Sequence, residues 1–106
     1  MTATYSIFMH MNATKAWLKL SAQERRNYII QELAPIAQKY PTVSITFFDA
    51  EAYTARCSDI AILKTQALED YAHLMDALRK SVLFTEPYFE LVDIIPTVEA
   101  DYLAGI

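Results

Sequence analysis

Residues 43–65, VSITFFDAEAYTARCSDIAILKT, decide the fold of this chain. Val43–Asp49 and Asp59–Thr65 are rich in β-branched and aromatic residues, which predicts two consecutive strands. They show little clean alternation of apolar and polar residues, which favours strands covered on both faces. The connection 50–58 has no glycine and is longer than a tight hairpin turn. Either the strands extend into it or it forms a short helical turn.

A helix and a further strand are predicted before this pair. Ser21–Glu24 has the sequence of a capping box, and apolar residues follow at helical spacing as far as Tyr40. Pro35 falls inside this pattern and predicts a kink or break, because it lacks an N–H and crowds the preceding turn. Thr4–Met11 is the predicted first strand, and residues 12–20 are predicted to form a loop.

The same two elements are predicted after the pair, in the same order. Gln66–Val82 carries an apolar stripe at helical spacing, and Tyr88–Ile95 is the predicted fourth strand, ended by Pro96. The tail, residues 97–106, is too apolar to be free in solvent. We expect it to dock on a partner subunit.

The order strand, helix, strand, strand, helix, strand predicts an α+β protein of the ferredoxin-like class, with residues 1–106 as a single domain. Its four-stranded antiparallel sheet would have the order 4-1-3-2, with two helices on one face. The apolar fraction of 54% is high for so short a chain. We therefore expect a homodimer in which the helix-free sheet face is buried.

The predicted sheet order also groups charged residues at its two ends. We expect the first and third strands to be parallel neighbours at the centre. This places His10 at one rim, near Lys64, Tyr88 and Glu90. The charged residues expected at the opposite rim are Asp49, Arg56, Asp59 and Asp93.

The rim that contains His10 is the candidate ligand-binding site. His10 would be a polar anchor or general base, with Glu90 orienting it and Trp17 and Tyr88 as apolar walls. The alternative is that His10 is a satisfied core or interface residue. Catalytic residues are not identified. Glu90 and Asp93 are an odd number of residues apart, so they are expected on opposite faces of their strand.

The remaining charges and the cysteine are interpreted as structural. Arg56 has acidic neighbours on both sides and is expected to pair with Asp49 or Asp59, with an acidic ligand as the alternative. Cys57 is the only cysteine, which excludes an intramolecular disulfide and a cysteine-based zinc site. We expect a buried, inert thiol. The two histidines share no motif, so no metal site is predicted.

Composition limits the partners and the location. The formal net charge of −4 argues against nucleic acid and anionic membranes as partners, since both require clustered basic residues. The only glycine is Gly105, so a glycine-rich phosphate loop is excluded, and no cofactor is expected. The sequence shows no signal peptide and no apolar run near the roughly 20 residues that span a bilayer. The expected location is the cytoplasm.

Four parts of the sequence carry a resemblance to a known family: 8–18 (FMHMNATKAWL), 33–36 (LAPI), 47–53 (FFDAEAY) with 56–59 (RCSD), and 87–96 (PYFELVDIIP). Together they resemble the darcynin family of small bacterial proteins. The resemblance covers nearly the whole chain but names no chemistry, because the family has no assigned activity. More loosely, the element order resembles the dimeric α+β-barrel proteins, which include cofactor-free monooxygenases and muconolactone isomerases.

Three functions are compatible with these observations. The leading hypothesis is a dimeric barrel that binds a small molecule and carries no tightly bound cofactor. The first alternative is a structural or interaction module whose sheet face only forms the dimer. The second is a monooxygenase-like or isomerase-like enzyme. The fold is compatible with all three and does not choose between them.

Overall fold

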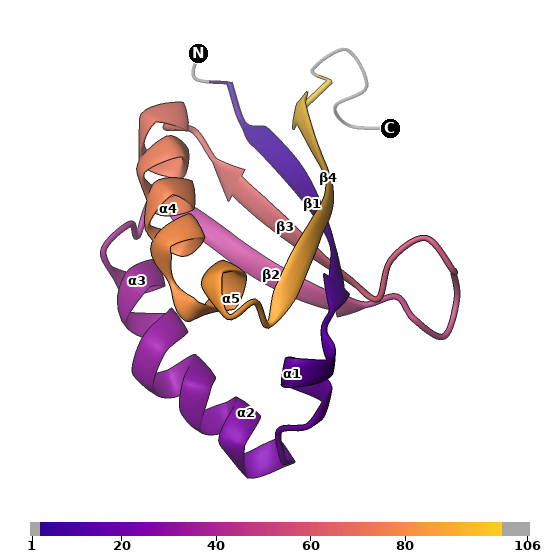
Figure 1. The fold of residues 1–106 in the computed structure, drawn as a ribbon. Coiled ribbons are helices and arrows are strands. Elements are labelled where there is room, and N and C mark those ends of the chain that lie inside the picture. The colour runs from indigo at the N-terminus through magenta and orange to yellow at the C-terminus, as the bar shows by residue number, and fades with distance from the viewer. Residues whose placement is uncertain (1–2, 101–106) are drawn as a thin grey trace.

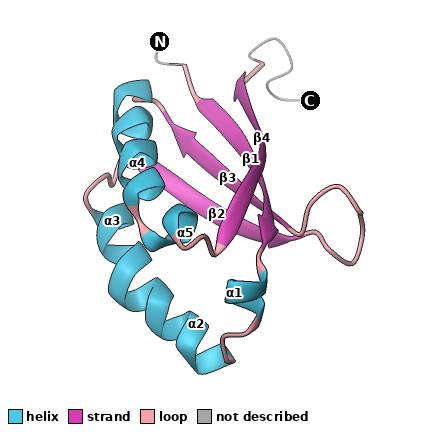
Figure 2. Cartoon of the chain, viewed as in Figure 1, coloured by secondary structure: helices cyan, strands magenta, loops and turns pink. Residues whose placement is uncertain are grey.

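The computed structural model describes residues 3–100. Helices cover one face of a four-stranded sheet, and no element of this range covers the other face (Figures 1 and 2). The tail residues 101–106, predicted to dock on a partner, lie outside the described residues. The strands are β1 Tyr5–Ala13, β2 Val43–Asp49, β3 Asp59–Thr65 and β4 Phe89–Val98. The helices are α1 Lys15–Leu18, α2 Ala22–Tyr28, a π-helical turn Ile29–Leu33, α3 Ala34–Gln38, α4 Leu68–Lys80 and α5 Val82–Thr85.

The sheet confirms the predicted fold class. Its order is β2-β3-β1-β4, the predicted 4-1-3-2 viewed from the other edge, and every neighbouring pair is antiparallel. The prediction that the first and third strands are parallel was wrong. The helical layer returns the chain so that β2 runs parallel to β1, and the hairpin then reverses β3.

Because β1 and β3 are antiparallel, some residues of the two predicted rims lie at the other end of the sheet from the one predicted. Ser6 lies opposite Lys64, and His10 lies opposite Ile60, so Lys64 is at the far end of the sheet from His10. Asp59 lies opposite Met11, at the end where His10 lies. The rim predicted around His10 therefore mixed residues from both ends of the sheet, whereas Asp49, Asp59 and Asp93, predicted at the opposite rim, lie at the same end as His10.

A β-bulge in β4 changes which residues share a face. The β1–β4 register shifts between His10 and Met11, with His10 opposite Asp93 and Met11 opposite Leu91, so Val92 is the extra residue. Glu90 lies opposite Asn12. Since His10 and Asn12 share a face of β1, Glu90 and Asp93 lie on the same side of the sheet, and the prediction of opposite faces was wrong.

Pro96 lies inside β4 and does not end it, contrary to the prediction. This strand is an edge of the sheet, where a residue without an N–H is tolerated because one side of the strand needs no partner. The 50–58 connection projects beyond the sheet (Figure 1). It contains the predicted short turn, with the Tyr53 and Thr54 amides donating to the Ala50 carbonyl at 2.9 and 3.1 Å.

The first predicted helix is present but interrupted. The π-helical turn 29–33 stands immediately before Pro35, so the predicted irregularity is confirmed. The wider turn accommodates a ring that would otherwise crowd the carbonyl of Gln31. The second predicted helix divides into α4 and α5, because Ser81 between them has extended backbone angles. The loop predicted at 12–20 contains the short helix α1.

The capping box at the start of α2 is confirmed. The Glu24 amide donates to Ser21 Oγ at 3.1 Å, and the Ser21 amide donates to Glu24 Oε1 at 2.9 Å. The bond from the Ser21 amide also holds the pKa of the Glu24 carboxyl below its usual value. Both bonds satisfy amides that the helix itself leaves without partners.

Replacing the capping serine should loosen α2. We expect Ser21→Ala to lower the free energy of unfolding by about 1 kcal/mol, as for other N-cap serines. Urea denaturation would measure the loss. The matched control is Ser44→Ala, at an exposed position of β2 outside any helix cap. Equal effects of the two changes would show that the cap does not stabilise the helix.

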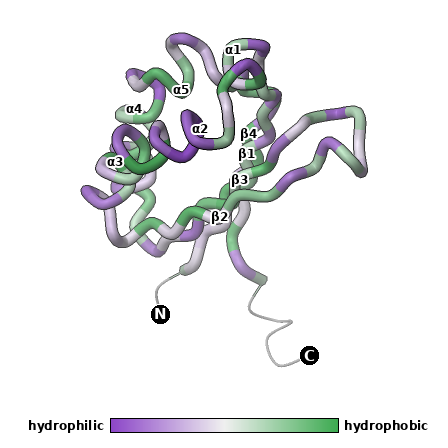
Figure 3. The backbone as a smooth tube through the Cα atoms, turned by 90° about the horizontal axis from the view of Figure 1, so that it is seen from below, coloured by the Kyte–Doolittle hydropathy of each residue, from purple (hydrophilic) through white to green (hydrophobic). Residues whose placement is uncertain are grey.

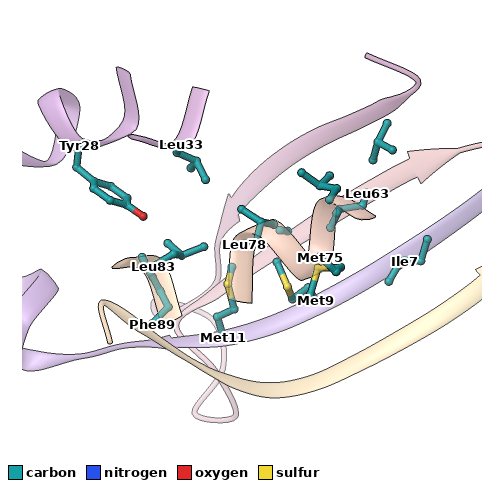
Figure 4. Close-up of a cluster of buried hydrophobic side chains, with 13 residues drawn as sticks. Ile7, Met9, Met11, Tyr28, Leu33, Leu63, Met75, Leu78, Leu83 and Phe89 are labelled. Carbon is teal, nitrogen blue, oxygen red and sulfur yellow. The ribbon is translucent and has the colours of Figure 1, made fainter. Parts of the chain in front are cut away.

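The hydrophobic core lies between the sheet and the helices (Figure 4). Ile7, Met9 and Met11 form the buried face of β1, each at most 2% exposed. Leu63 of β3 and Leu74 of α4 are fully buried against them. This layer fixes the position of α4 over the centre of the sheet.

The helix-free face of the sheet is also apolar at its centre. The register places Phe8 between Ile62 of β3 and Ile95 of β4 on this face. Phe48 of the edge strand β2 lies one step along, 48% exposed, and Ile95 is 41% exposed. Figure 3 shows the bare side of the sheet beneath the helical layer. An exposed apolar surface of this kind is typical of an interface.

Candidate functional site

A pocket of about 470 Å³ opens between the α1–α2 region and the sheet. Its floor is formed by buried core residues and its mouth by charged residues of helix α2 and of the ends of β2 and β3. Its volume lies within the range of small-molecule sites, which is roughly 300–1,000 Å³. The lining residues are Met11, Trp17, Ala22, Arg25, Arg26, Tyr28, Ile29, Leu33, Phe47, Asp49, Asp59, Leu83 and Phe89.

Aromatic rings form one wall of the pocket. The Trp17 ring lies 5.9 Å from Tyr28, 5.5 Å from Tyr88 and 5.1 Å from Phe89, measured between ring centroids. Tyr28 and Tyr88 meet edge to face at 5.1 Å. These separations are those of mutually favourable aromatic pairs, so the rings fix one another's orientation.

Thr14 holds the two segments that supply this wall. Its hydroxyl lies 2.7 Å from the Pro87 carbonyl and 3.0 Å from the Tyr88 carbonyl, to which it donates. Its amide also donates to the Tyr88 carbonyl at 3.0 Å, and its Oγ1 accepts from the Trp17 amide. Thr14 thus caps α1 and joins it to the chain leading into β4. These hydrogen bonds of Thr14 bring the Trp17 and Tyr88 rings together.

Arg25 is fixed at the mouth of the pocket. Its Nε donates to the Trp17 carbonyl at 3.2 Å, and its Nη2 donates to the Leu18 carbonyl at 3.3 Å. The guanidinium carbon lies 5.5 Å from the centre of the Trp17 ring, within reach of a cation–π interaction. The ion pair present within residues 3–100 joins Lys80 to Asp76, so Arg25 has no carboxylate partner in that range.

Two carboxylates face the arginines from the sheet side of the mouth. Asp49 and Asp59 lie directly opposite each other in the β2–β3 register, and both line the pocket. Like charges opposite each other on neighbouring strands are destabilising. Ser58 Oγ donates to Asp59 Oδ1 at 2.7 Å. The mouth therefore has a basic side and an acidic side.

Tyr28 places a polar atom in the interior. Its side chain points inward towards Leu83 (Figure 4), and its hydroxyl is buried without a hydrogen-bond partner among the described residues. Burial raises the pKa of the Tyr28 hydroxyl, and the nearby Ser81 and Leu83 oppose the rise only in part. The hydroxyl is therefore a protonated, unused donor.

The structure brings together two of the four predicted site residues. Trp17 lines the pocket and contacts Tyr88 through the ring pairs. His10 belongs to the opposite face of the sheet, because it alternates with the core residues Met9 and Met11. Glu90 is exposed on the β4 edge and borders a shallower groove of about 330 Å³ near Arg79. Asp93 lies directly opposite His10, and Glu90 lies opposite Asn12, two residues further along β1.

The sequence reasoning missed Arg25, Tyr28 and Asp59 as pocket residues. The spacing of Arg25 and Tyr28 on one predicted helix was visible, but nothing in the chain indicated that this part of the helix stands away from the sheet. Arg56 is exposed and forms no ion pair within residues 3–100, so its predicted pairing was wrong. Cys57 is buried, as predicted.

Two negative findings concern the described range. In residues 3–100 no group of three or more histidine, cysteine, aspartate or glutamate side chains could hold a metal ion. No helix in the same range combines the length and the apolar character needed to cross a membrane.

The antiparallel β2-β3-β1-β4 sheet, covered by helices on one face and with a pocket between the layers, defines a ferredoxin-like α+β protein. The profile of the family Darcynin, described as a domain of unknown function, matches residues 1–105. The chain belongs to this family, and the resemblance seen in the sequence is confirmed.

Two relatives agree with this assignment. Darcynin 1 of Acinetobacter baumannii is 42% identical over 86 residues, which are 81% of this chain and 96% of the relative. Darcynin of Chromobacterium violaceum is 55% identical over 67 residues, which are 63% of this chain and 85% of the relative.

Among solved structures, a mutant chlorite dismutase from Candidatus Nitrospira defluvii matches with a TM-score of 0.74 over 92% of this chain, at 11% identity. A heme-binding protein from Thermus thermophilus matches with a TM-score of 0.74 over 91%, at 16% identity. The chain spans about 40% of the length of each of these two structures. At such identities the likeness shows the fold alone.

Proposed function

We propose that this protein is a single-domain, cytoplasmic homodimer of the α+β-barrel type that binds a small, mainly apolar molecule in the pocket between α2 and the sheet. The pocket of about 470 Å³ with aromatic walls is the observation that carries the proposal. The exposed side chains of Ile29 and Phe47 line the pocket, so it leaves apolar surface in contact with water. An apolar ligand would release that water and be favoured for this reason.

The ligand does not correspond to a histidine-held heme. A structural neighbour is named as a heme-binding protein, and heme iron is often held by a histidine. His10 lies on the other sheet face, and His73 pairs with Tyr40, 6.5 Å between ring centroids. Neither histidine lines the pocket. The pocket residues that could approach an iron are Met11 and Tyr28, and both are buried among the core side chains.

The helix-free sheet face supports the proposed homodimer. This face has an apolar centre at Phe8, Ile60 and Ile62, and one subunit leaves it in contact with water. Lys64 stands at one end of the face and Asp93 on the edge strand at the other end. A copy related by a two-fold axis could bring unlike charges together around the apolar centre.

Filling the pocket should abolish binding. We propose Ala22→Phe, which adds a ring at a pocket-lining position on the exposed first turn of α2. The probe is p-cresol, a neutral aromatic molecule. Trp17 is the only tryptophan, so its indole N–H gives a single reporter resonance at the pocket wall. In the wild-type protein this resonance should shift and saturate as p-cresol is added, and in Ala22→Phe it should not move.

The matched control is Ala72→Phe, at an exposed position of α4 that does not line the pocket. This variant should bind p-cresol like the wild type. Both variants should keep the wild-type melting temperature within a few degrees, since both sites are exposed. A wild-type protein whose Trp17 resonance does not respond, or an Ala22→Phe variant that binds normally, would contradict the proposed site.

A further inference from the structure

We infer that the ligand of this pocket is an aromatic acid with a hydrogen-bond donor at the end of the ring opposite its carboxylate. This inference rests on the proposed function and adds the chemical class of the ligand. It is drawn from three features of the pocket: an arginine without a carboxylate partner among residues 3–100, rings that flank the hollow, and two carboxylates on its far side.

Arg25 can bind an anion without first being reorganised. Two of its five N–H donors are used by the Trp17 and Leu18 carbonyls, which leaves about three for a ligand. The side chain is half-buried, lies over the Trp17 ring and has no carboxylate partner within residues 3–100. Arg26 beside it also lines the pocket. A planar guanidinium held in this way suits a carboxylate, which it can bind through two parallel bonds.

The walls favour a flat ring attached to that carboxylate. Trp17, Tyr28 and Phe89 surround the pocket, with Trp17 5.9 Å from Tyr28 and 5.1 Å from Phe89. Rings at these separations hold one another in place and present fixed surfaces to a ligand. An aromatic ligand loses little conformational entropy on entering such a site, because it has few rotatable bonds.

Asp49 and Asp59 determine what the other end of the ligand carries. Asp59 is half-buried, and its hydrogen bond from Ser58 leaves further acceptor sites on the carboxylate. A hydroxyl or amino group on the ligand could donate to these sites. A second carboxylate at this end would be repelled by both aspartates. The pocket therefore distinguishes a hydroxylated or aminated aromatic acid from an aromatic dicarboxylate.

Four probes of similar size separate these requirements: 4-hydroxybenzoate, 4-hydroxybenzamide, benzoate and terephthalate. We expect 4-hydroxybenzoate to bind most tightly in calorimetric titration. The amide, which lacks the charge, should bind at least about tenfold more weakly, as expected when a charged hydrogen bond is lost. Benzoate should bind more weakly than 4-hydroxybenzoate because it lacks the hydroxyl donor. Terephthalate should bind most weakly of the three acids.

Variants then assign the discrimination to residues. Arg25→Gln should weaken 4-hydroxybenzoate about tenfold and leave 4-hydroxybenzamide nearly unchanged. Asp59→Asn should remove most of the difference between benzoate and terephthalate. The controls are Arg79→Gln and Glu69→Gln, at exposed positions of α4 outside the pocket. They should bind all four probes like the wild type.

The outcomes distinguish this inference from the proposed function. If 4-hydroxybenzamide binds as tightly as 4-hydroxybenzoate, or terephthalate as tightly as benzoate, the inferred ligand class is wrong and the pocket still stands as a binding site. If none of the four probes binds while p-cresol does, the ligand class is again wrong. If p-cresol also fails to shift the Trp17 resonance, the proposed function fails with it. The comparison of the four probes uses only the wild-type protein. It therefore tests the inferred ligand class even if a variant folds poorly.

Discussion

Replacing Leu74 by alanine should lower the free energy of unfolding by about 2–5 kcal/mol, the range measured for large-to-small changes in well-packed cores. Leu74 is 0% exposed and stands on α4 against the centre of the sheet. Its loss removes apolar contacts and leaves a cavity that the surrounding strands cannot readily close. A change of this size is a large fraction of the stability of a typical small domain.

Leu68→Ala provides the matched control on the same helix. Leu68 is 44% exposed, so the same change there should cost no more than about 0.5 kcal/mol. Thermal unfolding at one fixed protein concentration would measure both, since each kcal/mol corresponds to roughly 4–8 °C in a protein of this size. Similar losses for Leu74 and Leu68 would contradict the placement of α4.

The strands at the centre of the sequence were predictable from the local chain. Val43–Asp49 and Asp59–Thr65 have the predicted bounds, because β-branched and aromatic residues and their polar neighbours specify them directly. The capping box of α2 was predictable for a similar reason. Its two hydrogen bonds join residues only three apart in sequence, so both partners can be recognised within one short motif.

The errors came from features that local patterns do not encode. Counting alternate residues placed Glu90 and Asp93 on opposite faces, but the bulge at Val92 adds one residue and reverses the count. Strand direction depends on how the helical layer returns the chain, which no single segment shows. Taking β1 and β3 as parallel moved Lys64 to the wrong end of the sheet.

Only part of the candidate site could be predicted, because local sequence patterns do not encode contacts between distant segments. Trp17 and Tyr88 were recognised as apolar walls from their residue type, and they do meet. Their meeting depends on Thr14, which bonds the Pro87 and Tyr88 carbonyls from far away in sequence. Arg25 is placed by carbonyls of the α1 segment, which the sequence indicated only as a loop. Long-range bonds of this kind set the geometry of the pocket.

Placing a charge at the centre of the helix-free face should convert the proposed dimer to a monomer. Ile62 is half-buried on this face, between Phe8 of β1 and Thr46 of β2. In a dimer, Ile62→Asp would bring two carboxylates into an apolar interface, where an unpaired charge costs several kcal/mol. In a monomer the same carboxylate would remain hydrated. The change should therefore weaken association far more than folding.

Light scattering after gel filtration would measure the mass at micromolar concentration. The wild type should have twice the chain mass of 12.1 kDa, and Ile62→Asp should have the single-chain mass with an unchanged far-UV circular dichroism spectrum. Phe48→Asp, at the edge of the same face, tests the interface if Ile62→Asp folds poorly. Val82→Asp places the same charge on an exposed residue of α5 and should remain dimeric. A monomeric wild type, or folded Ile62→Asp and Phe48→Asp variants that both stay dimeric, would show that this sheet face is not the interface.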